Sequence, residues 1–486
     1  MITYDKLFIG GEWTEPSGPD LLDLVSPHDQ APLGRAAQAL PADVDRAVAA
    51  ARAAFDDGAW PNTPPADRIA VLRRLNALRE ARADDVAAII SAENGSALWF
   101  TRAGQTGLTR QANAYLDAAE GFGWEETLTP SDPGVPVRSV VRREAIGVVA
   151  AIIPWNSPFS AALAKVIPAL LAGNTVVLKV SPENSLSMNL LAGLLAEAGL
   201  PRGVVSVLPA DRETSEYLVK HPDVDKVAFT GSTRAGRRIA SLAGAQLKRV
   251  SLELGGKSAA VILPDADLGA AIQGLKFGSL LNNGEACIAQ TRILAPRGRY
   301  DEVVAGLKEM VESLPVGDPA DEKTFIGPMV RPDQQQRVRD YIALGVEEGA
   351  RLVTGGAQVP AGLELGNYVT PTLFADVSNT MRIAQEEIFG PVLVVIAYDD
   401  SDGTVDDAVR IANESEYGLS GGVWSADREH ALAVARRLRT GTVTVNGAPI
   451  GFDGPFGGFK ASGFGREYGV VGLTQYIEYK TVTVPA

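Results

Sequence analysis

Short apolar runs alternate with helical segments between residues 147 and 254, and this alternation constrains the fold more than any other feature. Strands are expected at 147–153, 175–180, 204–208, 226–230 and 249–254, with helices at 160–171, 186–198, 213–220 and 234–242. Apolar strands that alternate with helices form parallel βαβ units, so the pattern predicts a doubly wound α/β sheet of the nucleotide-binding type. Ligands of such sheets bind beyond the carboxyl ends of the strands.

The N-terminal part predicts a strand and turn followed by helices, and no chemistry. The strand and turn cover 7–13, and helices are expected at 41–55, 65–82, 83–94 and 101–119. Their Ala, Leu and Arg content reflects helix propensity. Residues 137–143 alternate in polarity like an exposed strand. We interpret a group of arginines as a solvated helix face: Arg73, Arg74, Arg79 and Arg82.

Two loops after predicted strands carry polar residues that can bind charged atoms. Asn156 lies between Pro154 and Pro158, where a stiff loop can present its amide to an oxyanion; the alternative is a rigid turn without chemistry. Ser232 follows the strand that ends at Thr230 and can cap the next helix, whose exposed N–H groups suit a phosphate. The segment lacks the Gly-x-Gly-x-x-Gly pattern, so the dinucleotide signature is met only weakly.

Glu253 stands out at the end of the last strand of this series. It lies between Leu252 and Leu254, and an apolar setting raises the pKa of a carboxyl group and suits it to general-base catalysis. The following residues, 256–258, superficially resemble a phosphate-binding P-loop. A P-loop also requires a glycine at position 251, which is serine, so this alternative is rejected.

Cys287 is the only cysteine of the chain. A lone cysteine is most often a small buried hydrophobe. Here small and polar residues flank it, and Gly284 lies three positions before it, which favours an accessible turn. A nucleophilic thiolate needs a base or a positive field, and donors for the oxyanion that it creates. One cysteine also forbids an intrachain disulfide.

Composition excludes several classes of function. The net charge of −14 argues against nucleic acid as a partner, because phosphate binding needs a basic surface. The three histidines, His28, His221 and His430, are widely separated, so no metal site is expected. The N-terminus lacks a signal peptide and no run of about 18 apolar residues occurs, which predicts a cytoplasmic protein without a membrane span. A chain of 486 residues is expected to form two or three domains.

Six segments, in order, resemble motifs of the aldehyde dehydrogenase superfamily, in its hydrolytic, non-CoA-acylating type. They are 154–156 (PWN), 229–233 (FTGST), 253–257 (ELGGK), 284–287 (GEAC), 387–391 (EIFGP) and 455–463 (PFGGFKASG). The resemblance runs from 8–13 to 478–482, and the spacing from Glu253 to Cys287 also matches. It implies an α/β fold with a Rossmann-like NAD(P)-binding domain (1–126 and 146–255), an α/β catalytic domain that carries the nucleophilic cysteine (256–455) and a small β flap for oligomerisation (127–145 and 470–486).

The resemblance implies oxidation of an aldehyde to a carboxylic acid with a nicotinamide cofactor. Cys287 would attack the carbonyl, while the Asn156 amide and the backbone N–H of Cys287 would hold the oxyanion. After hydride transfer, Glu253 would activate water to hydrolyse the thioester; this glutamate is absent from CoA-acylating relatives. Lys165 matches a lysine near the family's active site that supports catalysis or relays protons, and the alternative is an exposed helix lysine.

The same resemblance assigns residues to the cofactor. Lys179 would hydrogen-bond the adenine ribose, and Glu387 would bind the nicotinamide ribose. Many NAD-preferring members carry a glutamate at the position of Pro182. Its loss removes a repulsion against the 2′-phosphate of NADP unless Glu183 compensates, so we expect NAD and leave NADP as the alternative. Further cofactor contacts are expected from Trp155, Gly231, Ser232 and Phe389.

Small side chains predict a roomy, apolar aldehyde tunnel. Some relatives carry larger residues, including Trp, at the positions of Ala161 and Ala164. Ala286, Ile288 and Phe456 would complete the wall, so aromatic or long aliphatic aldehydes are expected. A semialdehyde or betaine-type substrate is the alternative within the family, and a non-catalytic, crystallin-like scaffold or a redox sensor are alternatives outside it. The resemblance also implies a homodimer or homotetramer.

Overall fold

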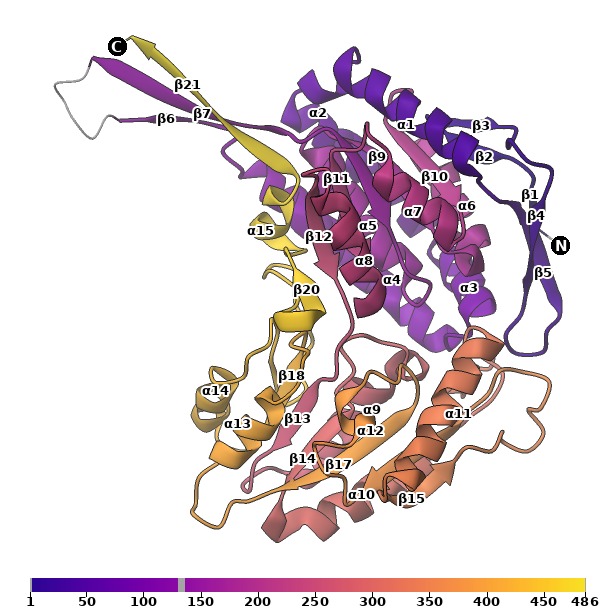
Figure 1. Cartoon of the computed structure of the whole chain (residues 1–486), viewed down its shortest axis with the longest axis vertical. Coiled ribbons are helices and arrows are strands. Elements are labelled where there is room, and N and C mark those ends of the chain that lie inside the picture. Colours follow the sequence, from indigo (N-terminus) through magenta and orange to yellow (C-terminus); the bar gives the residue numbers. More distant parts are fainter. Residues whose placement is uncertain (1, 130–135, 486) are drawn as a thin grey trace.

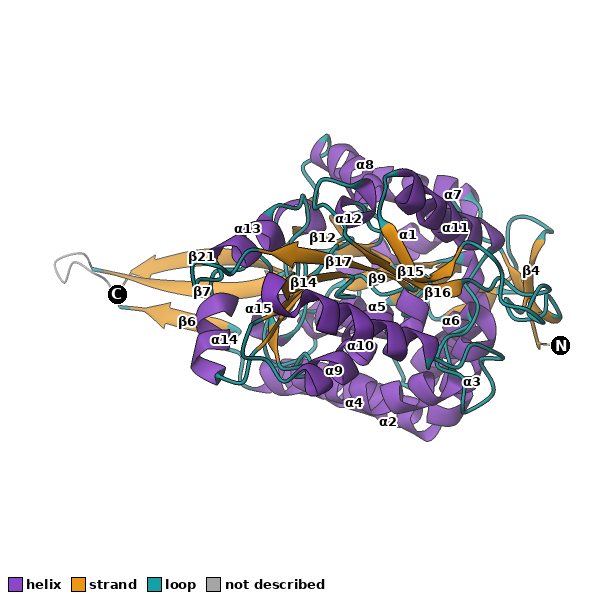
Figure 2. Ribbon diagram, turned by 90° about the horizontal axis from the view of Figure 1, so that it is seen from below, coloured by secondary structure: helices purple, strands orange, loops and turns teal. Residues whose placement is uncertain are grey.

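The computed structural model describes residues 2–129 and 136–485 of the chain. Met1, Ala486 and residues 130–135 of the predicted flap lie outside the described residues. Figure 1 shows two lobes stacked along the long axis, with a β arm that projects from the upper lobe. Each lobe is built on a mainly parallel sheet, which confirms the predicted α/β fold. In Figure 2 the strands run through the middle of the molecule, with helices above and below.

The upper lobe contains a sheet in the order β20-β12-β11-β8-β9-β10-β2-β3. Its central strands are parallel, as the alternation of strands and helices predicts. Each lies within one residue of its predicted bounds: β8 (Val148–Ile152), β9 (Thr175–Val180), β10 (Val205–Pro209), β11 (Lys226–Thr230) and β12 (Arg249–Glu253). The antiparallel edge strands are β2 (Leu7–Ile9), β3 (Glu12–Thr14) and β20 (Gly463–Phe464).

The order of strand addition reverses between β8 and β11. β9 and β10 extend one side of β8, whereas β11 and β12 extend the other. The register aligns Ile152 with both Lys179 and Phe229. It also aligns Thr230 with Glu253. Because parallel strands end at the same edge, the loops after β8, β9, β11 and β12 meet at this edge, where ligands bind in such sheets.

Helices cover both faces of the upper sheet. One face carries α2 (Pro65–Ala81), α3 (Ala83–Asn94), α4 (Leu98–Glu120), α5 (Pro158–Leu171) and α6 (Ser185–Glu197), and the other carries α1 (Pro41–Asp56), α7 (Arg212–Lys220) and α8 (Thr233–Gly244). The interpretation of Arg79 as solvated is wrong. This residue of α2 is 1% exposed and donates hydrogen bonds to Gln105 and Thr109, because α4 covers it.

The lower lobe contains the sheet β15-β16-β17-β14-β13-β18-β19, in which β15 alone among these strands pairs antiparallel. α9 (Leu268–Leu280) and α10 (Tyr300–Glu312) pack on one face; α11 (Pro332–Glu347), α12 (Arg382–Gln385), α13 (Asp406–Asn413) and α14 (Arg428–Ala435) pack on the other. The strands are β13 (Ala259–Ile262), β14 (Arg292–Pro296), β15 (Arg351–Gly356), β16 (Thr370–Ala375), β17 (Val392–Tyr398), β18 (Gly421–Trp424) and β19 (Thr444–Val445).

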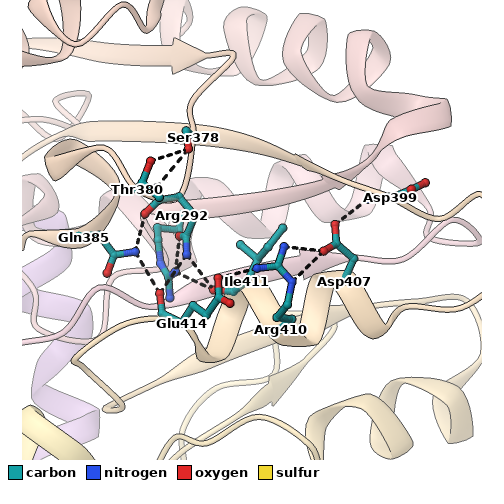
Figure 3. Close-up of polar contacts among 10 residues, drawn as sticks. Arg292, Ser378, Thr380, Gln385, Asp399, Asp407, Arg410, Ile411 and Glu414 are labelled. Carbon is teal, nitrogen blue, oxygen red and sulfur yellow. Dashed lines mark hydrogen bonds and ion pairs between the residues drawn. The ribbon is translucent and has the colours of Figure 1, made fainter.

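Arg292, the first residue of β14, is a buried cation that ties this sheet to the loops around it. It is 2% exposed and donates to the carbonyls of Lys257, Ile411 and Ala412 at 2.9–3.1 Å. It also donates to Asn379, and Figure 3 shows the guanidinium beside Ile411 within a wider polar network. Burial lowers its pKa to about 10, so the side chain stays charged near neutral pH and depends on these partners.

The chain crosses from the upper to the lower sheet between β12 and β13, and it returns between β19 and β20. The predicted domain boundaries, after residue 255 and after residue 455, fall within these two crossings. The division into domains stays a prediction, which this change of sheet supports.

The arm in Figure 1 is an antiparallel sheet in the order β21-β7-β6. Its pairing with the C-terminal strand runs from Ile477 opposite Ala145 to Pro485 opposite Val137, within the two segments predicted for the flap. Within the described part of the chain, no helix has the length and apolar character of a membrane span. The remaining elements are β1 (Ile2–Tyr4), β4 (Leu21–Val25), β5 (Pro32–Ala37), β6 (Glu125–Leu128), β7 (Val137–Ala145), α15 (Gly469–Thr474), β21 (Ile477–Pro485) and short 3-10 helices at Trp60–Asn62, Pro182–Asn184, Leu281–Gly284, Arg297–Arg299 and Lys460–Ser462.

Candidate active site

The carboxyl ends of the upper strands face loops that precede strands of the lower sheet. Asn156, in the loop after β8, donates from Nδ2 to the carbonyl of Glu285 in the loop before β14, at 2.7 Å. Glu387, before β17, accepts from the N–H of Gly256 at 2.9 Å. A Cβ on Gly256 would lie 2.4 Å from the Cys287 carbonyl oxygen, so only glycine fits this contact. The lobes therefore meet around the loop that carries the cysteine.

Cys287 is half-buried in this loop, between the 3-10 helix Leu281–Gly284 and β14. Burial, together with the nearby carboxylates of Glu387 and Glu253, raises the pKa of the thiol to about 12. The thiol is therefore protonated near neutral pH in this arrangement. Attack by its sulfur requires a neighbouring group that accepts the proton.

Glu253, the last residue of β12, is a candidate for that acceptor, because its charge acts on the thiol. The residue is 5% exposed, and its Oε2 has no hydrogen-bond partner among the residues that the structure describes. Burial and the carboxylate of Glu467 raise its pKa well above the usual range. A Cβ on Gly457 would lie 2.4 Å from Glu253 Oε1, so this glycine leaves room for the carboxyl group. An unpartnered carboxyl group of this kind can accept a proton or orient a water molecule.

Lys165 lies on α5 and is 1% exposed, so the alternative of an exposed helix lysine is wrong. Its Nζ donates to Glu467 at 2.5 Å and to Thr230 at 2.6 Å. Glu467, which follows the PFGGFKASG segment, is not among the predicted site residues. The position of Glu467 shortly after this motif is the only feature of the sequence that could have indicated its role, because a glutamate in a polar loop is common. The pair places a buried positive charge and a partly buried negative charge beside Glu253.

The predicted cofactor residues lie on the same edge of the upper sheet. Lys179, near the end of β9, is 8% exposed and makes no hydrogen bond or ion pair with any described residue; burial lowers its pKa to about 8. Ser232 caps α8, because its Oγ accepts from the N–H of Ala235 at 3.3 Å, and no acidic residue lies in the first turn of this helix. The free N–H groups of such a helix end suit a phosphate.

Three further predicted residues lie where the lower lobe meets this edge: Trp155 follows β8, whereas Glu387 and Phe389 precede β17 of the lower sheet. The rings of Trp155 and Phe389 meet edge to face at 5.5 Å. Burial raises the pKa of Glu387 to about 7, and only its Oε1 receives a backbone N–H. An unpaired ammonium group, a helix N-terminus and a carboxyl group that can still accept hydrogen bonds fit the phosphates and ribose hydroxyls of a nicotinamide dinucleotide. Gly231 is required by packing, because a Cβ there would lie 2.5 Å from the Phe229 ring.

Glu183, which could compensate for the glutamate that is missing at Pro182, is engaged by neighbouring residues. Its carboxylate forms an ion pair with Arg331 and accepts from the Ser181 hydroxyl. The carboxylate is thus held within the protein, although its charge still acts on Lys179.

The predicted tunnel residues come from both lobes. Ala161 and Ala164 are buried on α5, and the hydroxyl of Tyr115 donates to the Ala164 carbonyl at 3.2 Å. The same hydroxyl accepts from the N–H of Tyr468 at 2.7 Å. Tyr468 packs on Phe456 with a ring distance of 5.5 Å. Tyr115 therefore connects the alanine face of α5 with an aromatic wall. Phe456 of this wall was predicted from the sequence, whereas Tyr468 was not.

The other two tunnel residues, Ala286 and Ile288, are half-buried on either side of Cys287. Phe452 adds a second ring against Tyr468, at 5.0 Å. The surroundings of the thiol thus combine small and aromatic side chains. Within the described ranges, no group of three or more His, Cys, Asp or Glu side chains is arranged to hold a metal ion.

Comparison with known proteins finds related sequences and structures over nearly the whole chain. The family model described as the aldehyde dehydrogenase family matches residues 13–482. A geranial dehydrogenase of Castellaniella defragrans is 45% identical over 481 residues, which cover 99% of both chains. A 3-succinoylsemialdehyde-pyridine dehydrogenase of a Pseudomonas species is 41% identical over 490 residues, again 99% of both. The crystal structure of a Mycobacterium tuberculosis aldehyde dehydrogenase with NAD+ has a TM-score of 0.96 and 47% identity, and covers 99% of this chain and 98% of that one. The chain belongs to the aldehyde dehydrogenase family.

Proposed function

We propose that the protein oxidises aldehydes to carboxylic acids at Cys287, with Asn156 and Glu253 as its main partners. The observation that carries this proposal is the meeting of three groups at the contact between the lobes. They are the half-buried thiol, the amide bonded to the cysteine loop, and the carboxyl group without a partner on Oε2.

In the first step, the Cys287 thiol gives its proton to Glu253 and its sulfur bonds to the aldehyde carbon. The carbonyl oxygen becomes an oxyanion. Asn156 uses one N–H of its amide on Glu285, and the second N–H is available to the oxyanion together with the backbone N–H of Cys287. A donor of this kind typically stabilises the transition state by about 2.7–4 kcal/mol.

A bound nicotinamide supplies the acceptor for the hydride that leaves the tetrahedral carbon, so a thioester remains on Cys287. Glu253 must first release the proton that it took from the thiol, and it then takes a proton from water while the water oxygen attacks the thioester carbon. The carbon–sulfur bond breaks, the acid leaves, and sulfur departs as the thiolate. The Lys165–Glu467 pair lies beside Glu253 and can pass its proton outward.

NAD is the cofactor of this proposal, with NADP as the alternative. Lys179, Ser232 and Glu387 would bind the dinucleotide, with Trp155, Gly231 and Phe389 around it. Supporting this, the related M. tuberculosis enzyme was crystallised with NAD+. The NADP alternative stays open because Arg331 holds the carboxylate of Glu183, which is then not free to repel the 2′-phosphate of NADP. Measuring kcat/KM with both cofactors tests the choice, and a large preference for NADP would overturn it.

Bulky apolar aldehydes are the proposed substrates. The support is the small Ala164 on α5, which Tyr115 joins to the aromatic pair of Tyr468 and Phe456, and the name of the geranial dehydrogenase relative agrees. The semialdehyde alternative stays open because another relative, the Pseudomonas 3-succinoylsemialdehyde-pyridine dehydrogenase, is named for a semialdehyde. An anionic substrate would need a cation at the tunnel, and none of the predicted tunnel residues is basic.

Turnover of an aldehyde panel tests the whole proposal. Geranial, octanal, benzaldehyde, succinic semialdehyde and betaine aldehyde are compared, with Cys287→Ala as the control. Greatest turnover on apolar aldehydes, lost in the variant, is expected. Best turnover on a charged aldehyde would contradict the substrate class alone. Folded protein without cysteine-dependent turnover would contradict the chemistry and favour a scaffold.

The arm formed by β6, β7 and β21 is proposed to pair with a second subunit in a homodimer or homotetramer. Leu128, Val482 and Val484 of this arm are 39–42% exposed, which supports contact with another chain. Mass measurement of the wild type and of a chain that ends before β21 tests this. A cytoplasmic location is part of the same proposal, and cell fractionation tests it.

A further inference from the structure

We infer that Asn283 is a positioning residue that fixes the loop carrying Cys287. The inference rests on the proposed function, in which the sulfur of Cys287 attacks the aldehyde. It concerns a residue that lies outside every motif used to recognise the family.

The Asn283 side chain is fully buried and joins three segments. Its Nδ2 donates to the carbonyl of Gly95, at the end of α3, at 3.0 Å, and to the carbonyl of Pro328 at 3.1 Å. Its Oδ1 accepts from the N–H of Gly327 at 2.7 Å. The junction is tight, because a Cβ on Gly327 would lie 2.1 Å from the Gly95 carbonyl oxygen. A buried amide in this place satisfies three backbone groups that no water could reach without opening the junction.

The backbone of the same segment adopts a conformation that needs external support. Asn282, Asn283 and Gly284 have φ values of 55°, 61° and 74° in succession. Left-handed residues usually occur singly, so a run of three is held by its surroundings. Asn282 is held too, because its Nδ2 donates to the Asn156 carbonyl at 2.9 Å.

The other end of the loop is fixed independently. Gln290 donates its N–H to the Gly278 carbonyl at 3.0 Å, and its own carbonyl accepts from the Ser279 hydroxyl at 2.7 Å. Arg292 follows with the bonds shown in Figure 3. The short stretch with Cys287 is therefore held at both ends. At the end nearer Asn283, this side chain acts together with the bonds that join Asn282 and the Glu285 carbonyl to Asn156, so its loss removes three bonds and loosens that end.

Asn174 provides a matched control. It is also fully buried, donates from Nδ2 to the carbonyls of Ala169 and Tyr476 at 3.0 and 2.9 Å, and accepts from the N–H of Gly147 at 2.9 Å. It precedes β9, at the opposite end of that strand from the active-site edge. Asn→Asp at either position removes the same two donated bonds and leaves the acceptor oxygen.

The experiment compares Asn283→Asp, Asn283→Gly and Asn174→Asp with the wild type. Glycine removes the side-chain bonds but accepts the left-handed backbone, so it decides the question if the aspartate variant does not fold. Alkylation of Cys287 by iodoacetamide, followed against pH, reports on the thiol directly because the chain has no other cysteine. kcat, KM and thermal unfolding are measured on the same samples.

Both Asn283 variants are expected to slow alkylation and to lower kcat about 10- to 100-fold, with a smaller change in KM, because misplacement of a reacting atom by about 1 Å has that effect. Asn174→Asp is expected to lower thermal stability without either change. Folded Asn283 variants with alkylation and kcat within about twofold of the wild type would overturn the inference, as would an equal loss in Asn174→Asp. If Cys287→Ala retains full turnover, the proposed function fails instead, and the alkylation result still decides whether Asn283 positions the thiol.

Discussion

Replacing Glu253 by glutamine separates the two halves of the proposed reaction. The amide has the shape of the carboxyl group but cannot accept a proton. Because Oε2 has no partner among the described residues, the replacement breaks no hydrogen bond there. The fold should therefore be retained, with a change in unfolding free energy of about 1 kcal/mol or less.

The expected loss follows from the role of the residue. Positioned general bases contribute about 100- to 10,000-fold to a rate, which corresponds to about 3–5 kcal/mol in activation free energy. The burial of Glu253 to 5% exposure excludes bulk water as an easy substitute, so a loss toward the upper end is expected for thioester hydrolysis. Thiol attack loses its proton acceptor too, so the burst should be slower than in the wild type. It should be slowed less than hydrolysis, because sulfur is a much stronger nucleophile than water.

Rapid mixing of the variant with aldehyde and excess NAD provides the assay. We expect one equivalent of NADH per Cys287 in an initial burst, followed by very slow turnover, and mass spectrometry should find the acyl group on the cysteine. Cys287→Ala serves as the control without a burst. Steady-state turnover within about twofold of the wild type would refute the hydrolytic role. Loss of the burst in the same proportion as turnover would place the main role of Glu253 in thiol activation.

Three further predictions concern the same site. Because burial raises the pKa of both Cys287 and Glu253, and the sulfur attacks once its proton has left, kcat/KM should rise as the pH is raised from neutral; a falling profile would contradict the assignment. Glu467→Gln removes a charge that raises the pKa of Glu253 and leaves Lys165, which lowers it, so the acidic limb of the profile should move to lower pH; an unchanged or upward-shifted limb would refute this coupling. Ala164→Trp should lower kcat/KM for octanal at least about tenfold more than kcat/KM for acetaldehyde, because the larger side chain narrows the tunnel. Equal losses for both aldehydes would refute the tunnel.

The upper sheet was predictable because its signal is local. Each of the strands β8 to β12 is an apolar run closed by a turn or a helix signal, and burial on both faces leaves such runs little alternative. Arg79 shows the limit of this reasoning. Its sequence neighbours are other arginines that do face solvent, and only the later helix α4 supplies the partners that bury it.

The site was predictable where a residue type itself carries chemistry, as for Cys287, Glu253 and Asn156. It was not predictable where chemistry depends on distant contacts. Glu467 gains a role only through a lysine 302 positions away. The carboxylate of Glu183, which could have bound the cofactor ribose, is instead paired with Arg331, 148 positions away. The sequence leaves such pairs open because neither partner is unusual in its own segment.

The glycines of the recognised motifs alone do not distinguish an enzyme from a scaffold. Gly256 and Gly457 are required because their surroundings leave no room for a Cβ, and a scaffold with the same lobes would need them equally. The unpartnered groups do distinguish the two. Among the described residues, the buried Glu253 Oε2 has no hydrogen-bond partner and the buried Lys179 ammonium has no hydrogen bond or ion pair, and each such group costs about 1–3 kcal/mol of stability. A scaffold gains nothing in return and would be more stable with apolar residues at both positions. An enzyme needs both groups free, one for a proton or water and one for the cofactor, so Glu253→Leu and Lys179→Met should raise the melting temperature while they abolish turnover and weaken NAD binding, respectively. A fall in melting temperature in both variants would show that the native partners of these groups are structural and would remove this argument against the scaffold.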